Sequence, residues 1–268
     1  MRVVALVPAA GRGVRLGAGM PKALVPVSGT SLLVRAVRGL LDSGRVHRVV
    51  VAAPPDQVEV VERELAQPGS IPDSADRSSG ARESADSADS GIALSESAVE
   101  VVPGGEDRTE SVRLALAAAE RSEPDAGVVL VHDAARAFTP PEVIREVVDA
   151  VAGGAPAVIP VLPVSDTIKQ VAQDAAGELV AGTVDRSQLR SVQTPQGFAL
   201  DVLRAAYEAA DGAATDDAGL VERLGGEVRT VPGHPHALKI TTAFDLAVAE
   251  AVLAAGETAP AATIGELR

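Results

Sequence analysis

A short run of β-branched residues that ends in a glycine-rich loop is the feature that most constrains the fold. Residues 2 to 7 (RVVALV) are typical of a strand buried in a parallel sheet, and PAAGRG follows them directly. The stretch from 31 to 42 places apolar side chains at helical spacing, and Ser31 can cap it. A second strand is predicted over 48 to 54. This βαβ order predicts a parallel sheet with covering helices.

The rest of the chain continues the alternation of strand and helix. Further strands, the first with its turn, are predicted at 99 to 105, 127 to 136 and 157 to 164. Further helices are predicted at about 111 to 120, 141 to 152, 199 to 210, 215 to 224 and 243 to 255. Alternating residues in SDTIKQV and ELVAGTVDR predict a β-arm at about 165 to 187. We therefore expect an α/β fold: a Rossmann-like three-layer α/β/α sandwich with a mainly parallel sheet and a projecting arm.

One domain is expected over 1 to 256, with an insertion inside it and a C-terminal tail at 257 to 268. The insertion, at about 68 to 98, is dominated by Ser, Asp, Ala and Gly and has no apolar period, which predicts disorder. Its six acidic residues against two basic ones place part of the chain's net charge of −13 outside the fold.

Composition excludes several classes of protein. A net charge of −13 is unlike that of a chain built to coat nucleic acid, which needs a basic face. The absence of cysteine excludes a thiolate metal site and a cysteine nucleophile. The apolar stretch at the N-terminus is too short to span a membrane. These observations predict a cytoplasmic protein that binds neither nucleic acid nor membrane.

The glycine-rich loop has the chemistry of a phosphate site. Its small residues let the backbone approach a triphosphate with N–H groups pointing inward, and Arg15 and Lys22 add positive charge. The spacing matches neither the dinucleotide motif nor the P-loop. An ordinary strand-to-helix turn remains the alternative for two glycines alone, but the following Arg and Pro-Lys favour phosphate binding.

At this point the chain resembles a known family. AAGRGVRL with MPKAL is similar to the signature of sugar-phosphate nucleotidyltransferases. Later motifs narrow the resemblance to the 2-C-methyl-D-erythritol 4-phosphate cytidylyltransferases: GGEDRTESV (104–112), VHDAAR (131–136), DTIK (166–169), VDR (184–186), TPQGF (194–198), TDDA (215–218) and LKITTAFDLAVAE (238–250). The resemblance implies a fold of the nucleotide-diphospho-sugar transferase type. It also implies transfer of CMP from CTP to methylerythritol 4-phosphate, with release of pyrophosphate.

The resemblance implies roles for the nucleotide side of the site. In-line attack on the α-phosphorus places negative charge on phosphoryl oxygens and pyrophosphate, so fixed cations matter more than a protein nucleophile. Arg15 and Lys22 are the catalytic residues in this interpretation. The predicted nucleotide-binding residues come from two loops: Pro8, Ala9, Ala10, Gly11, Gly13, Gly105, Glu106, Arg108 and Ser111.

The metal and the acceptor are assigned in the same way. Asp133 follows a buried strand, where a carboxylate can hold Mg²⁺ or another divalent cation together with substrate phosphates. The predicted acceptor-binding residues are Arg136, Thr167, Arg186, Thr194 and Lys239. In the family the β-arm reaches across a homodimer, so Thr167 and Arg186 are expected to serve the partner subunit's site.

Plainer interpretations stay open at several positions. A lone Asp133 also suits a helix cap, and the stretch at Gly105 also suits a simple turn before a helix. His132, His234 and His236 match no metal-ligand pattern and are expected to be structural or exposed. The alternative functions are ribitol 5-phosphate cytidylyltransferase and a non-catalytic nucleotide-binding protein. The chain ends soon after its last predicted helix, so we expect a monofunctional enzyme.

Removing the insertion tests whether it belongs to the catalytic domain. Deletion of residues 70 to 97 is expected to leave cytidylyltransferase activity largely intact, because the segment lacks the apolar period of a packed element. The measurement is pyrophosphate release by the deletion variant and the full chain at equal concentration. Loss of activity in a variant that still shows a cooperative thermal transition would assign the insertion a functional role.

Overall fold

The computed structural model describes residues 1–11, 20–66, 98–174, 177–211 and 215–256. The predicted insertion therefore lies, apart from Ala98, outside the described residues, as does the predicted tail. In the described part of the chain, no helix is both long and apolar enough to cross a membrane.

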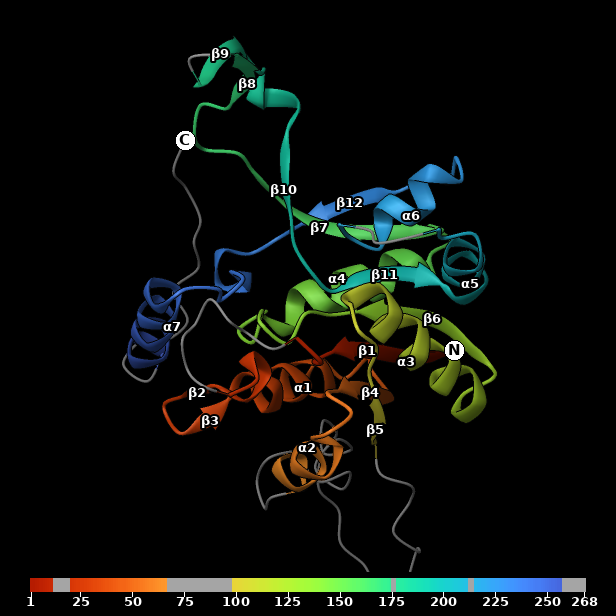
Figure 1. The fold of residues 1–268 in the computed structure, drawn as a ribbon. Helices are drawn as coiled ribbons and strands as arrows, with labels where there is room; N and C mark the ends of the chain where they lie inside the picture. Colours follow the sequence, from red (N-terminus) through yellow and green to blue (C-terminus); the bar gives the residue numbers. More distant parts are fainter. Residues whose placement is uncertain (12–19, 67–97, 175–176, 212–214, 257–268) are drawn as a thin grey trace, which may run out of the picture.

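A twisted sheet of eight strands lies at the centre of the described structure (Figure 1). The strand order is β10-β7-β11-β6-β1-β4-β5, and β12 also pairs with β7. Only β10 and β11 run antiparallel to their neighbours, so the predicted mainly parallel sheet is confirmed. The strand bounds are β1 (Arg2–Pro8), β4 (Arg48–Ala53), β5 (Val99–Pro103), β6 (Ala126–Val131), β7 (Ala157–Pro163), β10 (Arg190–Val192), β11 (Gln196–Ala199) and β12 (Arg229–Pro232).

Helices cover both faces of this sheet, which makes the predicted three-layer sandwich. Successive side chains of a strand point to opposite faces. In β1, Val3 and Val7 accordingly pack with α1 (Leu32–Asp42), α2 (Val58–Leu65) and α4 (Pro141–Ala152). Val4 and Leu6 pack on the other side with α3 (Arg108–Ser122), α5 (Leu200–Glu208) and α6 (Ala218–Arg223). β1 is thus buried on both faces, as its continuous apolar run predicts.

Side-chain caps set the starts of α1 and α3. The Ser31 hydroxyl accepts a hydrogen bond from the Val34 amide at 3.3 Å, which confirms the predicted cap of α1. The predicted start of α3 at Ser111 is wrong. The Asp107 carboxylate accepts from the Glu110 amide at 2.8 Å, so the helix begins at Arg108, one turn earlier. This shift places Arg108 in the first turn of α3.

Several elements differ from the sequence prediction. β6 ends at Val131, so HDAAR is a loop and does not extend the strand. The short elements β10, β11, β12 and α2 were not predicted, nor was the small hairpin of β2 (Pro26–Val27) and β3 (Thr30–Ser31). Three 3₁₀ turns also lie outside the prediction: Lys22–Leu24, Arg186–Gln188 and Pro235–Ala237.

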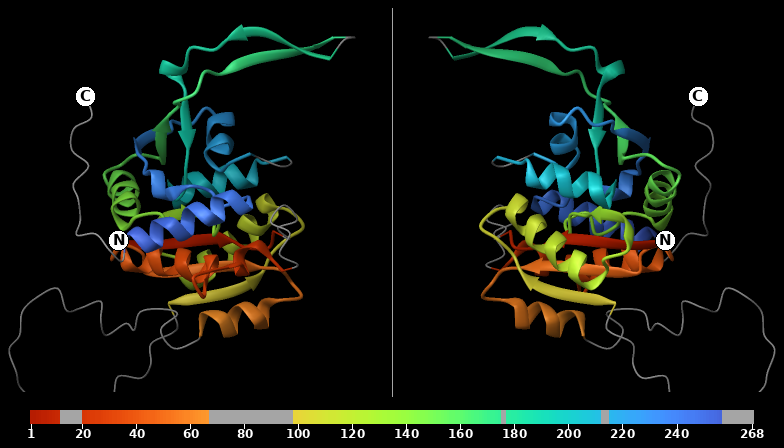
Figure 2. Two further views of the ribbon diagram at one scale, coloured as in Figure 1. Left: turned by 90° about the vertical axis from the view of Figure 1, so that its left-hand side faces the viewer. Right: turned by 90° about the vertical axis from the view of Figure 1, so that its right-hand side faces the viewer.

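The predicted arm is confirmed as a hairpin. β8 (Lys169–Asp174) and β9 (Gly177–Thr183) pair only with each other among the described strands, and they stand well away from the central sheet (Figure 2). β10 leads from the arm back to the edge of the sheet. The last helix, α7 (Ala243–Gly256), packs beside β2 through a small apolar cluster that includes Val27, Ile240 and Ala249.

Gly197 in β11 tests how tightly α4 packs on the sheet. A Cβ at this position would lie 2.5 Å from Val147 Cγ1 and 3.2 Å from Leu130 Cδ2, both in fully buried side chains. Gly197→Ala is therefore expected to lower the free energy of unfolding by about 1 to 3 kcal/mol, measured by urea denaturation. Gly182→Ala in β9 is the matched control, since no atom lies within 4 Å of its Cβ position. Equal stability of the two variants would contradict the described packing.

Candidate active site

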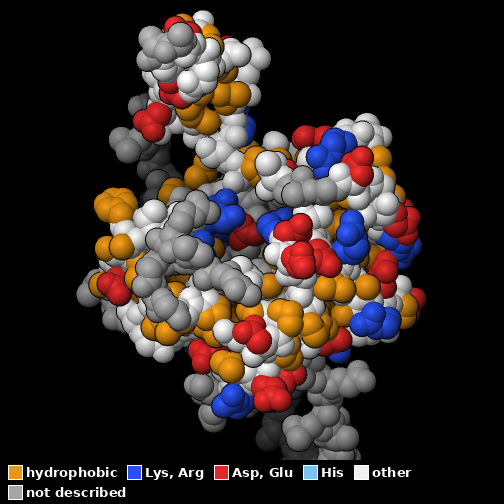
Figure 3. All heavy atoms as spheres, viewed as in Figure 1, with side chains coloured by type: hydrophobic (Ala, Val, Ile, Leu, Met, Phe, Trp, Pro, Cys, Tyr) orange, Lys and Arg blue, Asp and Glu red, His pale blue; other side chains and the backbone are white. Residues whose placement is uncertain are grey.

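Two adjoining pockets open where β1 and β6 end. The first has a volume of about 210 Å³ and is lined by eleven of the predicted site residues: Pro8, Ala9, Ala10, Gly11, Lys22, Gly105, Glu106, Arg108, Ser111, Asp133 and Lys239. The second, of about 390 Å³, is lined by the predicted acceptor residues Arg136, Thr194 and Lys239. Arg108, Asp133 and Lys239 line both pockets. Figure 3 shows charged side chains of both signs near the middle of this face.

A close contact between two loops shapes the first pocket. A Cβ at Gly104 would lie 2.8 Å from the Ala10 Cβ and 3.1 Å from the Ala53 carbonyl oxygen, so only glycine fits without displacement. The turn that follows is held by Ser111, whose hydroxyl accepts from the Gly105 amide at 3.1 Å and donates to the Asp107 carbonyl at 2.7 Å. Ser111 thus builds the turn, and the backbone of Gly105 and Glu106 borders the pocket.

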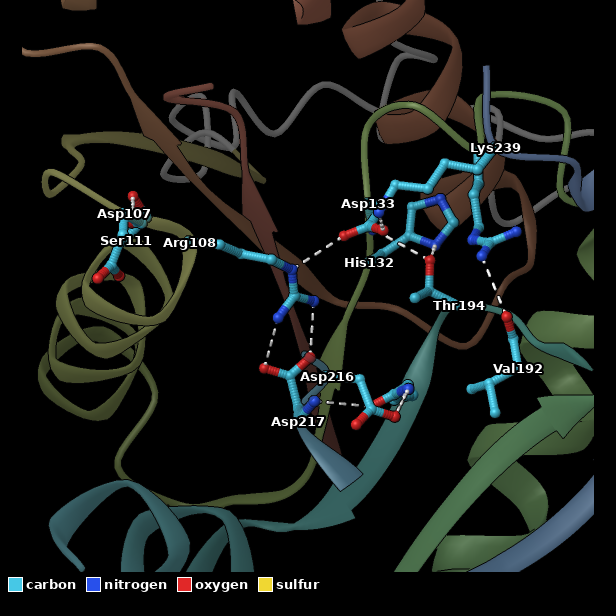
Figure 4. A network of polar contacts seen from close by, with 12 residues as sticks. Asp107, Arg108, Ser111, His132, Asp133, Val192, Thr194, Asp216, Asp217 and Lys239 are labelled. Carbon is cyan, nitrogen blue, oxygen red and sulfur yellow. Dashed lines mark hydrogen bonds and ion pairs between the residues drawn. The ribbon is translucent and has the colours of Figure 1, made fainter. Parts of the chain in front are cut away.

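A buried carboxylate lies on the wall that the two pockets share. Asp133 is 8% exposed; its Oδ1 accepts from Arg108 Nε at 3.2 Å and its Oδ2 pairs with Lys239 Nζ at 2.7 Å (Figure 4). Burial alone would raise the pKa of Asp133, but the charges of Arg108 and Lys239 hold it well below its usual range. Asp133 is therefore ionised across the physiological pH range.

The Arg108 guanidinium also pairs with a second carboxylate, that of Asp217. Its two terminal nitrogens donate to Asp217 at 3.0 and 2.7 Å, and the Tyr207 hydroxyl donates to the same carboxylate at 2.5 Å. Burial lowers the pKa of Arg108, but Asp217 and Asp133 outweigh that effect and raise it. Asp217 lies in the TDDA motif and Tyr207 in α5, but sequence reasoning assigned neither of them a role.

Arg136 and Thr194 connect the segments around the second pocket. The Arg136 guanidinium donates to the Ala237 carbonyl at 2.7 Å and to the Val192 carbonyl at 3.1 Å, while its buried Nε has no hydrogen-bond partner among the described residues. The Thr194 hydroxyl accepts from the Asp133 amide at 3.0 Å. Both residues fix the backbone that carries Asp133 and Lys239, in addition to lining the pocket.

Two of the predicted site residues, Thr167 and Arg186, do not line these pockets in the described structure. Thr167 and Arg186 are exposed near the base of the arm, where Arg186 donates to the Ser165 carbonyl. Gly13 and Arg15 lie outside the described residues. Their predicted roles therefore remain predictions.

Comparison with known proteins decides the family. The family model "IspD: 2-C-methyl-D-erythritol 4-phosphate cytidylyltransferase" matches residues 3–255. The chain belongs to the IspD family. A 2-C-methyl-D-erythritol 4-phosphate cytidylyltransferase of Saccharopolyspora erythraea is 69% identical over 95% of this chain and 100% of the relative. One of Rhodococcus jostii is 53% identical over 95% and 96% of the two chains.

Solved structures agree with the fold of an IspD protein. The crystal structure of 2-C-methyl-D-erythritol 4-phosphate cytidylyltransferase from Thermus thermophilus is 33% identical, with a TM-score of 0.66 over 94% of this chain and 98% of that chain. A 4-diphosphocytidyl-2C-methyl-D-erythritol synthase from Anaerococcus prevotii has a TM-score of 0.71 over 94% and 98% of the two chains; its 24% identity supports the fold alone.

A divalent cation is compatible with Asp133 in this IspD protein, although the described residues build no multi-carboxylate cage around it. No cluster of three or more His, Asp or Glu side chains that could hold a metal was found within the described ranges. Mg²⁺ commonly binds through one or two carboxylates with substrate phosphates completing its shell. Asp133 fits that mode as the ionised carboxylate common to both pockets.

His132 precedes Asp133 and is buried, in line with the structural role expected for it. Its Nδ1 lies 3.2 Å from the Thr194 hydroxyl (Figure 4), and the residue is 1% exposed. Burial lowers the pKa of His132 to about 4. The two other histidines for which this was expected also agree with it: His234 accepts from the His236 amide at 3.1 Å, and His236 is exposed.

The buried His132 makes stability depend on pH. Its pKa is near 6.5 in the unfolded chain and about 4 in the fold, so its contribution to stability is complete above pH 6.5 and is lost as the pH falls toward 4. With 1.4 kcal/mol for each tenfold change in proton affinity, this loss amounts to about 3 kcal/mol. As the pH is lowered from 6.5 toward 4, the difference in free energy of unfolding between wild type and His132→Asn should shrink by this amount. Urea denaturation at each pH measures this difference. His236→Asn is the control, and a gap independent of pH would contradict the assignment.

Proposed function

We propose that this IspD protein transfers CMP from CTP to 2-C-methyl-D-erythritol 4-phosphate and releases pyrophosphate, as a step of the non-mevalonate isoprenoid pathway. The observation that carries the proposal is the pair of pockets that meet at Arg108, Asp133 and Lys239. One pocket is bordered by backbone loops suited to a nucleotide, and the other by cationic side chains suited to a phosphorylated acceptor. The shared wall is where the two phosphates must meet.

The first pocket is the proposed CTP site. The Pro8–Gly11 loop and the turn at Gly105 and Glu106 place backbone groups against the ligand, which suits a triphosphate and a pyrimidine. Lys22 lines the same pocket, and we assign it and Arg15 to stabilising charge on the α-phosphate and the leaving pyrophosphate. Arg108 borders the site but forms ion pairs with Asp217 and Asp133. We therefore assign it mainly to holding Asp133 in place, and only secondarily to binding the nucleotide.

The second pocket is the proposed acceptor site. A phosphate oxygen of the acceptor attacks the α-phosphorus of CTP, and the bond from that phosphorus to the β-phosphate oxygen breaks in line with it. The attacking phosphate is already ionised at neutral pH, so no strong base is needed. Lys239 has a half-exposed side chain on the shared wall and suits the acceptor phosphate, with Arg136 and Thr194 beside it.

A divalent cation, Mg²⁺ in the proposal, would be held by Asp133 and would neutralise phosphate charge when bound. Asp133 then needs to exchange part of its pairing with Arg108 or Lys239 for the cation. The remaining carboxylate of the second pocket, Asp216, accepts from Gln196 Nε2 at 3.0 Å and from the Gly219 amide at 3.1 Å. Asp133 is assigned as the ligand because, unlike Asp216, it lies on the wall that both pockets share.

The arm supports a homodimer. Ile168, Val171, Leu179 and Val180 are exposed apolar side chains on or beside a hairpin that pairs with no other described strand. A second copy covering this surface would bury them, and it would bring Thr167 and Arg186 toward its own acceptor pocket. This arrangement gives the two arm residues the role predicted for them.

The decisive experiment measures pyrophosphate release with Mg²⁺ and CTP. Methylerythritol 4-phosphate should be strongly preferred over ribitol 5-phosphate and over no acceptor. Lys22→Ala should lower turnover by about 10²- to 10³-fold, because it removes a fixed charge at the transition state. Arg121→Ala, at an exposed position in α3, is the control and should be active.

Other results would redirect the proposal. Preference for ribitol 5-phosphate would retain the reaction and change the acceptor. CTP binding without turnover on either acceptor would favour a non-catalytic nucleotide-binding protein. Normal turnover by Lys22→Ala would contradict its catalytic role.

A further inference from the structure

We propose that Asp217 is a positioning residue of the transferase site, which together with Tyr207 orients Arg108 so that its Nε faces Asp133. Asp217 would act entirely through Arg108. The inference rests on the proposed function for its kinetic consequence, and on the described contacts for its geometry.

Backbone contacts fix where the Asp217 carboxylate lies. Its amide and that of Ala218 donate to Gln196 Oε1 at 3.1 and 2.9 Å, which ties the start of α6 to β11. Asp217 has 0% exposure. The carboxylate is therefore placed by the fold and cannot reach a ligand in either pocket.

The hydrogen bonds around Asp217 leave Arg108 with a single orientation. A guanidinium is planar, and a bidentate pair fixes that plane. With both terminal nitrogens on Asp217, the remaining Nε–H points at Asp133 Oδ1, as Figure 4 shows. The Tyr207 hydroxyl also donates to Oδ1 of Asp217. The Asp217 carboxylate thus accepts hydrogen bonds from three protein donors, and the Arg108 guanidinium balances its negative charge. No contact with a substrate is needed to stabilise it.

The consequence concerns the charges at the shared wall. Arg108 is partly exposed there, and Lys239 pairs with the other oxygen of Asp133. Without Asp217, Arg108 can turn to face Asp133 with its terminal nitrogens or reach into the nucleotide pocket. Either movement changes the pairing of Asp133 and the position of Lys239, at the point where the acceptor phosphate must be aligned. Small misplacements of this kind cost rate more than binding.

A double-mutant cycle tests the inference. Asp217→Asn keeps the size of the side chain and an acceptor for Tyr207, and it should lower kcat/KM for the acceptor by about 100-fold. CTP affinity, measured by calorimetry, should change by only a few fold. In an Arg108→Gln background the same substitution should add at most about a twofold loss, because a residue that acts through Arg108 has nothing left to orient.

Two further variants keep the cycle interpretable. Tyr207→Phe leaves both charges in place and removes one hydrogen bond, so it should fold and show a smaller loss that also disappears in the Arg108→Gln background. Arg204→Gln breaks a surface ion pair between α5 and α3, the same two helices, and should leave kinetics unchanged. If the losses multiply fully in the double variants, Asp217 acts independently of Arg108 and the inference is wrong.

A measurement without turnover separates this inference from the proposed function. In ¹⁵N-labelled protein, the Arg108 Nε–H signal, assigned by its loss in Arg108→Gln, should exchange slowly with water and should exchange rapidly in Asp217→Asn. Unchanged exchange would overturn the positioning role even in an active enzyme. Inactive wild-type protein with this exchange pattern would instead contradict the proposed function and leave the geometry supported.

Discussion

The pairing of Asp133 with Arg108 and Lys239 is the interaction on which the rest of the site depends. A carboxylate with 8% exposure needs compensating charge, and here the two cations come from segments more than a hundred residues apart, one in the first turn of α3 and one after β12. Removing either cation leaves a buried charge partly uncompensated. The same three groups border both pockets, so the contact that satisfies burial also sets the electrostatics where two anionic substrates meet.

The parallel sheet explains why such distant residues converge. β5, β4, β1 and β6 are neighbours in that order, so the loops at their carboxyl ends lie side by side. Gly104 lets the loop after β5 approach Ala10 after β1, and Asp133 follows β6. The antiparallel β11 then brings Thr194 against the Asp133 amide from the opposite direction. The strand order that defines the fold therefore also brings the residues of the site together.

The elements and site residues that the sequence predicts are those with a clear pattern of residue types. Long apolar runs such as β1 and β6 predicted the parallel sheet, and most residues that line the pockets were found through resemblance. The Asp217–Tyr207 pair was missed because the sequence does not show which of Asp216 and Asp217 is buried. The predicted start of α3 is too late because the residues around Asp107 resemble an ordinary turn. In the structure Asp107 caps the helix by accepting from the amide of Glu110, three residues later. β10 and β12 have three and four residues, too few for a period to be visible.

Continuity of the chain connects the arm to the reaction centre. From the 3₁₀ turn at Arg186, the chain enters β10 directly, and the Val192 carbonyl at its end accepts from Arg136, two residues before Thr194 contacts the Asp133 amide. Arg136 in turn holds the Ala237 carbonyl, close to Lys239. A contact that fixes the arm therefore restricts the backbone on both sides of the second pocket. A second copy that covers the exposed apolar side chains of the hairpin, as proposed above, would therefore act on the same backbone that borders the acceptor pocket.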